Sequence, residues 1–399
     1  MLVARYVNKC DVFVMLNLLY SLQGMLYSPG IINQMLQLLI ILWSMSVALK
    51  YILNFYTGPE MLKVISSLIY MYTLYGTIHL LFGNPFLSHI NELPSRYIYL
   101  QVSLKSLLPI YVFYHYARQG LLTASKIRFY AIIMLVTLIP KYYYDNAKTL
   151  LLNNRDEQQS NMGYVFLGII PTLFFFHKKP LMQYILFAII LIYLILAMKR
   201  GAIAIGIICS FALIVSNLFS KDRKQRFWSI LFSIVIVVGF ISVITYMMTE
   251  SDYFALRLEK TLSGDSSGRD DIYGSIWRTI VEEPNVFYLL CGRGADSTWA
   301  FAGNYAHNDW LETLCNNGII GGAVLLYFYF TLFKKSFKSR LSLSRNYFIG
   351  FVVLFIIAFS KSLFSMFIQN IDISISMLLG YYLFWINRPY NELQQEELI

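Results

Sequence analysis

Long uncharged apolar runs, separated by short polar segments, dominate the pattern of the chain. Two of the clearest are YILFAIILIYLILAM at 184–198 and FWSILFSIVIVVGFISVITYMM at 227–248. A helix needs about 20 apolar residues to cross a hydrocarbon core of about 30 Å, and these runs are near that length. The pattern therefore predicts an all-α, polytopic transmembrane helical bundle.

About twelve apolar stretches are predicted to span the membrane. In chain order they cover residues 12–27, 31–52, 61–83, 97–117, 127–144, 162–177, 180–198, 201–219, 227–248, 310–333, 346–364 and 371–386. The fourth stretch carries Lys105 and Pro109, which favours a kinked helix that faces protein.

Lysines and arginines in the connecting segments predict the orientation of these spans. With the N-terminus inside, the inner segments hold 19 of these residues, whereas the short outer segments hold 7. Cytoplasmic loops carry an excess of Lys and Arg. Both termini are therefore expected in the cytoplasm, and the first apolar stretch is expected to be a span rather than a cleaved signal peptide.

One connection is much longer than the others and lies outside in this topology. It runs from Thr249 to Ala306, and residues such as Trp277 and Trp299 give it apolar surface with which to fold against the bundle. Long loops of this kind are usually functional or disordered. The predicted division of the chain is spans 1–9 over 1–248, a large outer (periplasmic) loop over 249–309, and spans 10–12 with a cytoplasmic tail over 310–399.

Composition agrees with a membrane protein. Hydrophobic residues make up 57% of the chain and charged residues 14%, against roughly 25% charged in an ordinary soluble domain. The net charge of +10 is assigned to the loop cations that orient the spans, not to nucleic-acid binding. The cysteines show no CxxC spacing, so neither a metal site nor a disulfide scaffold is predicted; they are Cys10, Cys209, Cys291 and Cys315.

The stretch AMKRGAIAIG at 197–206 places two cations between apolar runs. Lys199 and Arg200 face outside in the predicted topology, against the trend that concentrates such residues in the cytoplasm. One interpretation is an interfacial anchor, in which the long side chains extend to the headgroups. The other is an anion site, since Gly201 lets the backbone approach and an arginine binds phosphate through two hydrogen bonds.

The stretch SGDSSGRDDIYGSIW at 263–277 combines turn-forming residues with a helix start. Ser267, Asp270 or Asp271 is expected to cap the helix that carries Trp277. Arg269 then either extends into solvent or faces an anion at the membrane surface, and the residues alone leave both interpretations open.

A Gly-X-Gly turn, CGRGADS, follows at 291–297. It lacks the strand and helix context of a dinucleotide fingerprint, so nucleotide binding is excluded. Taken by itself, Arg293 in this turn is interpreted as an exposed residue.

The stretch NYAHNDWLETL at 304–314 opens the tenth span. Asp309 and Glu312 have the spacing of a capping box, which predicts that Asp309 caps the helix, and Trp310 is typical of a membrane interface. His307 and Asn308 have no such structural explanation. An imidazole, with a pKa of about 6.5, accepts a proton from a hydroxyl at neutral pH, so His307 is a candidate general base.

Two glycines lie further along the same span. Gly318 and Gly322 have GxxxG spacing, which predicts close packing against another helix.

The order of these motifs resembles the bacterial O-antigen polymerase and O-antigen ligase superfamily. The shared features are many spans, KRG at the outer end of one span, a large outer loop with SGR and a following Trp, then GRG, HNDWLE and GIIGG. They cover residues 197–322, while the first half of the chain matches only in hydropathy. The resemblance implies a membrane glycosyltransferase with a GT-C-like fold in the bacterial inner membrane.

The resemblance also implies an activity and roles for residues. The activity is inverting transfer of a sugar chain from undecaprenyl pyrophosphate, with His307 as the general base on the acceptor hydroxyl. Implied pyrophosphate-binding residues are Arg200, Arg269 and Arg293, and implied supporting residues are Asn308, Asp309 and Glu312. No cofactor, metal ion, nucleotide sugar or nucleic acid is expected.

The preferred activity is that of a polymerase, which joins lipid-linked repeat units of O-antigen, capsule or exopolysaccharide. Three other activities stay open beside it. A ligase would transfer the finished polymer to the lipid A core. A flippase for lipid-linked oligosaccharides would also have many spans, although paired repeats and interrupted spans are more typical of transporters. A peptidoglycan polymerase fits the HND motif less well. A chain-length regulator protein is a candidate partner of a polymerase.

Overall fold

The computed structural model of the chain describes residues 7–22, 25, 30–54, 59–88, 96–153, 160–219, 223–250, 255–256, 259 and 268–388. The regular elements in these residues are helical. Before the long outer connection they are α1 (Lys9–Ser21), α2 (Gly30–Ile52), α3 (Glu60–Phe82), η1 (Pro85–Leu87), α4 (Ile98–Gln101), η2 (Val102–Leu107), α5 (Leu108–Arg118), α6 (Ala124–Asn153), α7 (Met162–Ile169), η3 (Ile170–Phe176), α8 (Pro180–Leu196), α9 (Arg200–Leu218) and α10 (Arg223–Glu250). After it come α12 (Arg269–Val281), α13 (Val286–Cys291), α14 (Thr298–Ala302), α15 (Asp309–Lys338), η4 (Ser339–Leu341), α16 (Arg345–Phe364), η5 (Ile368–Asn370) and α17 (Ile373–Trp385).

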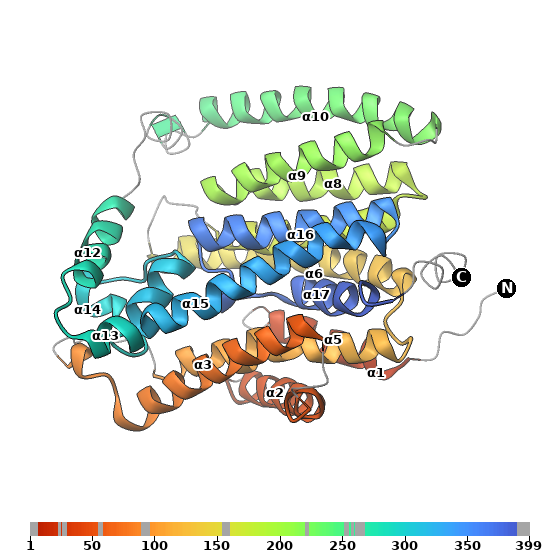
Figure 1. The fold of residues 1–399 in the computed structure, drawn as a ribbon. Helices are drawn as coiled ribbons and strands as arrows, with labels where there is room; N and C mark the ends of the chain where they lie inside the picture. Colours follow the sequence, from red (N-terminus) through yellow and green to blue (C-terminus); the bar gives the residue numbers. More distant parts are fainter. Residues whose placement is uncertain are drawn as a thin grey trace.

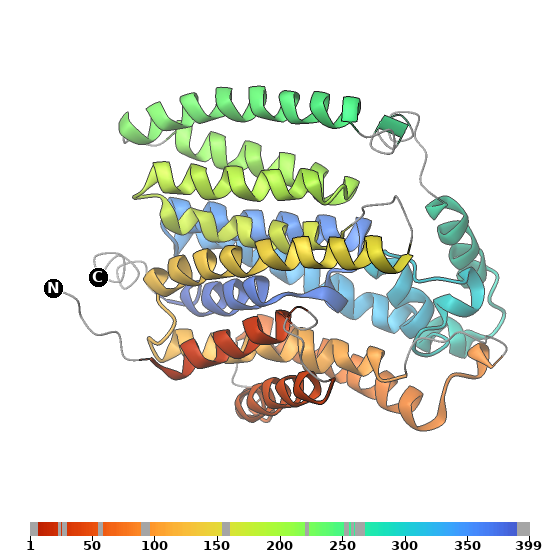
Figure 2. The same cartoon turned by 180° about the vertical axis from the view of Figure 1, so that it is seen from behind.

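The long helices lie side by side in stacked layers (Figure 1). α10 is outermost on one side, next to α8 and α9, and α2 and α3 lie on the opposite side, with α16, α15 and α17 between them. Seen from behind, α6 lies across the bundle (Figure 2). α1 begins and α17 ends at the same end of the bundle, whereas α12, α13 and α14 cover the other end.

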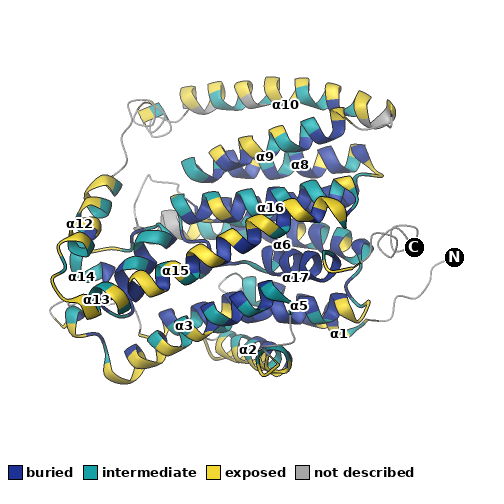
Figure 3. Cartoon of the chain, viewed as in Figure 1, coloured by how far each residue is buried: buried dark blue, intermediate teal, exposed yellow. Residues whose placement is uncertain are grey.

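Burial separates the centre of the bundle from its rim (Figure 3). Every residue from Ser374 to Trp385 in α17 is buried, and this helix packs chiefly against α5. α10 is the opposite case, because apolar side chains such as Ile234 and Val238 are more than half exposed. A helix that is apolar all round belongs in a protein core or in lipid, so the exposed side of α10 is suited to the acyl chains of a bilayer.

Each of the twelve predicted ranges overlaps a helix or a run of consecutive helical turns. Within the described residues, six helices are long and apolar enough to cross a membrane: α2, α3, α9, α10, α15 and α16. Three shorter apolar stretches, Met162–Phe176, Pro180–Leu196 and Ile373–Trp385, are also helical. The chain is therefore all-helical over the residues described and has the helices of an integral membrane protein.

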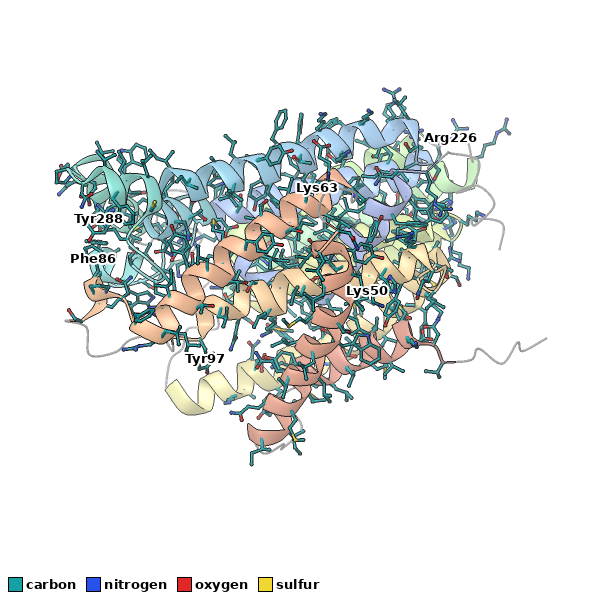
Figure 4. The ribbon with its side chains drawn as sticks, turned by 60° about the horizontal axis from the view of Figure 1, so that its bottom comes forward. Lys50, Lys63, Phe86, Tyr97, Arg226 and Tyr288 are labelled. Atoms are coloured by element: carbon teal, nitrogen blue, oxygen red, sulfur yellow. The ribbon has the colours of Figure 1, made fainter. Side chains whose placement is uncertain are left out.

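The predicted outer loop contributes short helices at one end of the bundle. Ile276 of α12 packs against Ala306 and Cys315, and these side chains form a small separate core. Phe86 contacts Tyr288 of α13 edge-on, with ring centroids 5.4 Å apart, far from Arg226 at the opposite end (Figure 4). The outer segment is thus held to the bundle by apolar and aromatic contacts.

The helix predicted to be kinked at Pro109 widens into a π-helical turn, η2, one turn earlier. Proline has no N–H to donate to the carbonyl of the residue four positions before it, and its ring crowds that carbonyl. That residue is Lys105, which lies within η2. The wider turn accommodates the proline, so the predicted irregularity is confirmed, although the Lys105 side chain is exposed.

Candidate functional site

Asn308, rather than Asp309, caps α15. The Asn308 Oδ1 accepts hydrogen bonds from the backbone N–H groups of Trp310 at 2.9 Å and Leu311 at 3.1 Å. The predicted capping box of Asp309 and Glu312 is therefore wrong. Asn and Asp are almost equally good caps, and here they are neighbours, so the spacing alone pointed to the wrong one.

The Asp309 carboxylate instead holds the segment that links α16 to α17. It is 1% exposed, and its Oδ2 accepts hydrogen bonds from the backbone N–H groups of Phe367 at 2.9 Å and Ile368 at 3.1 Å. The Tyr329 hydroxyl donates to the same oxygen at 3.3 Å. Buried backbone N–H groups need acceptors, and Asp309 provides one where the chain leaves α16.

Glu312 ties the loop that carries His307 to α15. Its Oε1 accepts hydrogen bonds from the Thr298 hydroxyl at 2.8 Å and the Asn316 side-chain amide at 3.1 Å. Its Oε2 accepts from the backbone N–H of Ala306 at 2.9 Å. The residue just before His307 is thereby fixed to the helix that follows it.

His307 lies between these anchors in a left-handed backbone conformation, with φ of 50°. This region is uncommon for residues other than glycine, and such residues gather at functional sites when their surroundings hold them there. The imidazole is half-buried. Within the described residues it makes no hydrogen bond, so both ring nitrogens are left for a bound group.

Arg269 begins α12 and reaches the end of α16. Its NH1 group donates a hydrogen bond to the carbonyl oxygen of Phe364, the last residue of α16, at 3.0 Å. The last carbonyls of a helix lack partners within the helix and attract cations. Arg269 is therefore placed by α16 rather than extended freely into solvent.

The start of α12 differs from the predicted cap. Gly268 occupies the N-cap position and has no side chain with which to cap the helix. Asp270 and Asp271 lie in the first turn instead, so the cap prediction is wrong for both, and Ser267 lies outside the described residues. An uncapped N-terminus keeps N–H groups that an anion can use.

The first turn of α9 packs against the same end of α16. α9 begins at Arg200, and a Cβ added to Gly201 would lie 3.3 Å from the Phe364 Cβ. Lys199, in the N-cap position, provides no side-chain cap. Met198, one residue earlier, has a left-handed backbone with φ of 50°. The KRG motif therefore lies at a strained turn beside the end of α16.

Two tyrosines border this region. The Tyr164 hydroxyl of α7 donates to the Phe364 carbonyl oxygen at 3.5 Å, and the Tyr273 hydroxyl, one turn after Arg269, is buried without a hydrogen bond to any described residue. Buried hydroxyls are normally paired. Elements far apart in sequence thus converge on the last residue of α16.

Burial, and then nearby positive charge, favours the neutral form of His307. Burial, and then the nearby charges of Arg269 and Lys199, lower the pKa of His307 below its usual value of about 6.5. The imidazole is therefore neutral at neutral pH and able to accept a proton. The neighbouring residue Asn308 and Arg269 both bind carbonyls of the last turn of α16, so His307 and Arg269 lie in the same region.

Arg293 has a different environment. It is 7% exposed and forms a buried ion pair with Glu283, and its NH2 group also donates to the Thr279 carbonyl oxygen at 2.6 Å. The guanidinium lies over the Phe301 ring, 5.2 Å from its centroid. The interpretation of Arg293 as exposed is therefore wrong, and its hydrogen-bonding groups serve the outer segment.

Gly318 breaks α15 at the point where this helix packs against the end of α13. Its φ is 65° and its ψ −164°, and a Cβ there would collide with the backbone of Leu290 and Gly292. The kink leaves carbonyls of the preceding turn free, and the backbone N–H groups of Arg293 and Gly294 donate to two of them at 3.0 Å each. Gly318 thus allows the backbone of α15 to approach α13 and the CGRG loop, so the predicted close packing is confirmed at this glycine, through a kink in α15.

Lys361 is a buried polar residue near the site that the sequence analysis did not single out. It is 3% exposed, its Nζ donates to the Asn370 carbonyl oxygen at 2.9 Å, and it lies 5.6 Å from the centroid of the Tyr164 ring. A lysine within an apolar span is itself a signal of function. That signal was present in AFSKSLF and would have marked the end of α16.

No metal site emerges from the described part of the chain, where no three His, Cys, Asp or Glu side chains come close enough together to hold an ion.

Comparison with known proteins identifies the part of the chain that contains this site. Residues 185–326 match the family model described as O-antigen ligase. This range includes the KRG turn at the start of α9, Arg269 and His307. No curated protein matches the chain. Members of the matched family are glycosyltransferase-like enzymes, either polymerases or ligases. This match covers about a third of the chain, and over residues 185–326 it supports similarity to the O-antigen polymerase and O-antigen ligase superfamily.

Proposed function

We propose that the chain is an inverting glycosyltransferase that polymerises repeat units carried on undecaprenyl pyrophosphate. The observation that carries this proposal is that Asn308, the neighbour of His307, and Arg269 both bind carbonyls of the last turn of α16. A neutral imidazole there can take a proton, and a guanidinium beside it can hold an anionic leaving group. An acceptor hydroxyl and a lipid diphosphate are the two groups that such a pair serves.

The proposed reaction is a single displacement. The acceptor hydroxyl oxygen attacks the anomeric carbon of the donor sugar while its proton passes to His307. The bond between that carbon and the diphosphate oxygen breaks, and the electron pair leaves with the diphosphate. Inversion follows, because the hydroxyl attacks from the face opposite to the leaving group. His307 acts as the general base, a contribution typically on the order of 10²–10⁴ in rate.

The proposed diphosphate site combines charge with backbone donors. Arg269 is positioned by the Phe364 carbonyl, and Arg200 and Lys199 begin α9 beside it. The N-termini of α9 and α12 both lack a side-chain cap, and helix N-termini bind phosphate through free N–H groups. Fixed donors of this kind stabilise the charge that develops on a leaving group without reorganising. Asn308, Asp309 and Glu312 support the site by holding His307 and the end of α16.

We further propose how the chain lies in the bilayer. The twelve predicted ranges cross a bacterial inner membrane in a GT-C-like arrangement, with both termini in the cytoplasm and residues 249–309 outside. Two observations support this orientation: α1 begins and α17 ends at the same end of the bundle, and the outer segment covers the other (Figure 1). A chain-length regulator is the proposed partner protein.

A ligase is the second candidate. It is favoured by the printed description of the matched family, O-antigen ligase. A ligase uses the same donor and base, but its acceptor is a sugar of the lipid A core. Deleting the gene and analysing surface glycolipids separates the two: single repeats on the core indicate a lost polymerase, and a core without any attached sugar chain indicates a lost ligase.

The direct test is transfer by purified protein with a synthetic undecaprenyl pyrophosphate repeat unit. Arg269→Ala should lose most of its turnover, and Arg269→Lys should restore only part, because a lysine cannot reproduce the guanidinium fork. Arg278→Ala, an exposed arginine on the same helix, is the matched control and should keep normal turnover. Equal activity in Arg269→Ala and Arg278→Ala would remove Arg269 from the site.

A further inference from the structure

A half-open cavity of about 300 Å³ lies among the helices, apart from the site at the end of α16. Residues of α1, α2, α6 and α7 line it, together with η2 and the segment that links α16 to α17. Its lining includes the amides of Asn17, Gln37, Gln369 and Asn370. Most of the lining is apolar and a few polar side chains reach it, which is typical of ligand sites. The volume is at the lower end of those of ligand sites.

Lys105 adds a positive charge to this lining. It lies in the π-helical turn η2. At the usual rise per residue, this turn is about 10 Å along the helix from Ile98, where α4 begins. Single π-helical turns occur often at functional sites. The Lys105 side chain is exposed to the opening, while its neighbours Ser103 and Ser106 are buried.

Lys105 has no acidic partner among the described residues. Its Nζ lies 4.7 Å from the centroid of the Tyr20 ring, a cation–π contact. The other lysine of the lining, Lys141, is already paired, with its Nζ 2.6 Å from the Asp145 Oδ1. The one carboxylate of the lining, Asp372, has the charge of Lys361 nearby. No acid among the described residues therefore matches the charge of Lys105, and an ionisable residue within a predicted span is itself a signal of function.

We infer that Lys105 binds the phosphate group of a membrane lipid in this cavity. An ammonium group and side-chain amides are suited to phosphate oxygens, with the ammonium forming the stronger, charge-assisted bond. A lipid is the natural carrier, because the cavity lies among apolar helices that a bilayer surrounds.

This site is separate from the one proposed for glycosyl transfer. Met162, Val165 and Ile169 of α7 line the cavity, whereas Tyr164 on the same helix contacts Phe364 at the end of α16. The Ser106 hydroxyl donates to the Gln369 carbonyl oxygen at 3.0 Å and joins η2 to the segment between the two sites. The inference goes beyond the proposed function and does not depend on which glycan is transferred.

Lipid binding to purified, delipidated protein tests the inference by native mass spectrometry. The probes are a polyprenyl phosphate, phosphatidylglycerol and diacylglycerol, which has no phosphate. Lys105→Gln should weaken binding of at least one phosphate-bearing probe by about tenfold, the effect of one charged hydrogen bond. Diacylglycerol binding should stay unchanged. The probe that responds identifies the source of the phosphate as a polyprenyl lipid or a phospholipid.

Three further variants keep the test decisive. Lys50→Gln removes an exposed lysine of α2 that does not line the cavity and should leave binding unchanged. Gln37→Phe fills the cavity from α2 without removing charge and should reproduce the loss, which covers the case in which Lys105→Gln fails to fold. The loss should persist in an Arg269→Ala background. Unchanged binding in Lys105→Gln or Gln37→Phe, an equal loss for diacylglycerol, or an effect that needs Arg269 would overturn the inference.

Discussion

The side-chain amide of Asn308 donates a hydrogen bond to the carbonyl oxygen of Leu363 at 3.2 Å. The next carbonyl, that of Phe364, accepts the hydrogen bond from Arg269. Two adjacent carbonyls at the end of α16 therefore position Asn308, which is next to the candidate base His307, and Arg269, the candidate phosphate ligand. The distance between His307 and Arg269 is set by the last turn of α16, although neither residue belongs to that helix.

Asn308→Ser should separate this tie from helix capping. Serine keeps an oxygen for the N-cap but cannot reach the Leu363 carbonyl with a donor, so thermal stability should change little while turnover falls. Asn308→Ala should lose turnover and also about 0.5–2 kcal/mol of stability, since it removes the cap. Thermal unfolding and transfer assays on the two variants give the comparison. Full activity in Asn308→Ser would show that the tie to Leu363 does not matter.

His307→Ala should lower turnover on the order of 10²–10⁴ if this residue is the general base. Binding of the lipid-linked donor should remain, because the cations that hold it are intact. In the wild type, the rate should rise with pH as the imidazole loses its proton, and level off before neutrality, since the pKa of His307 is lowered. Single-turnover rates and donor binding, measured over a pH series, check both statements. Near-normal rates in His307→Ala would assign the base to another group.

Arg269→Gln and Lys199→Gln should each move this pH profile to higher pH. Both cations lower the pKa of His307, so removing either charge lets the imidazole hold its proton up to a higher pH. The shift is read from the acid side of the profile, even where the maximum rate is reduced. Arg278→Gln removes a charge elsewhere on α12 and should leave the pH profile unchanged. If the profiles of all three variants coincide with one another, the three residues do not share one site.

Asp309→Ala should lower stability more than the loss of a cap does. The substitution leaves the buried N–H groups of Phe367 and Ile368 without an acceptor, and each buried unsatisfied group costs about 1–3 kcal/mol. Asp271→Ala, an exposed acid in the first turn of α12, is the control. Denaturation in detergent should show a large loss for Asp309→Ala and little for Asp271→Ala, and similar values would contradict the buried role.

Arg293→Ala should act through folding rather than through substrate. Removing one partner of a buried ion pair is expected to cost about 3–5 kcal/mol, because Glu283 would keep its charge without compensation. The protein that does fold should retain a near-normal KM for the lipid-linked donor. Glu283→Gln should lower the unfolding temperature in the same direction. A raised KM in stable Arg293→Ala protein would instead return this residue to the phosphate site.

The candidate site was partly visible in the sequence. HNDWLE marked a polar cluster at the start of a span, and KRG and SGR marked cations beside helix starts, because these residues are rare in apolar surroundings. The sequence did not show which of these polar residues take part in chemistry and which stabilise the fold. Asn308 and Asp309 exchanged roles relative to the predicted capping box, and Lys361 was overlooked although it is a lysine in a span. Local spacing identifies helix ends but does not tell which neighbouring polar group turns inward.

The sequence by itself determined that the chain forms apolar helices and which stretches of the chain contain them, because hydropathy acts over a few residues. Only the tertiary structure decided which polar groups meet. Arg269 and Phe364 are 95 residues apart in the chain, and Asn308 and Leu363 are 55 apart. Lys105 meets the cavity through a turn widened by Pro109 and through side chains from other helices. Such contacts depend on how each helix is rotated and packed against its neighbours, and the period of apolar residues along one helix does not contain that information.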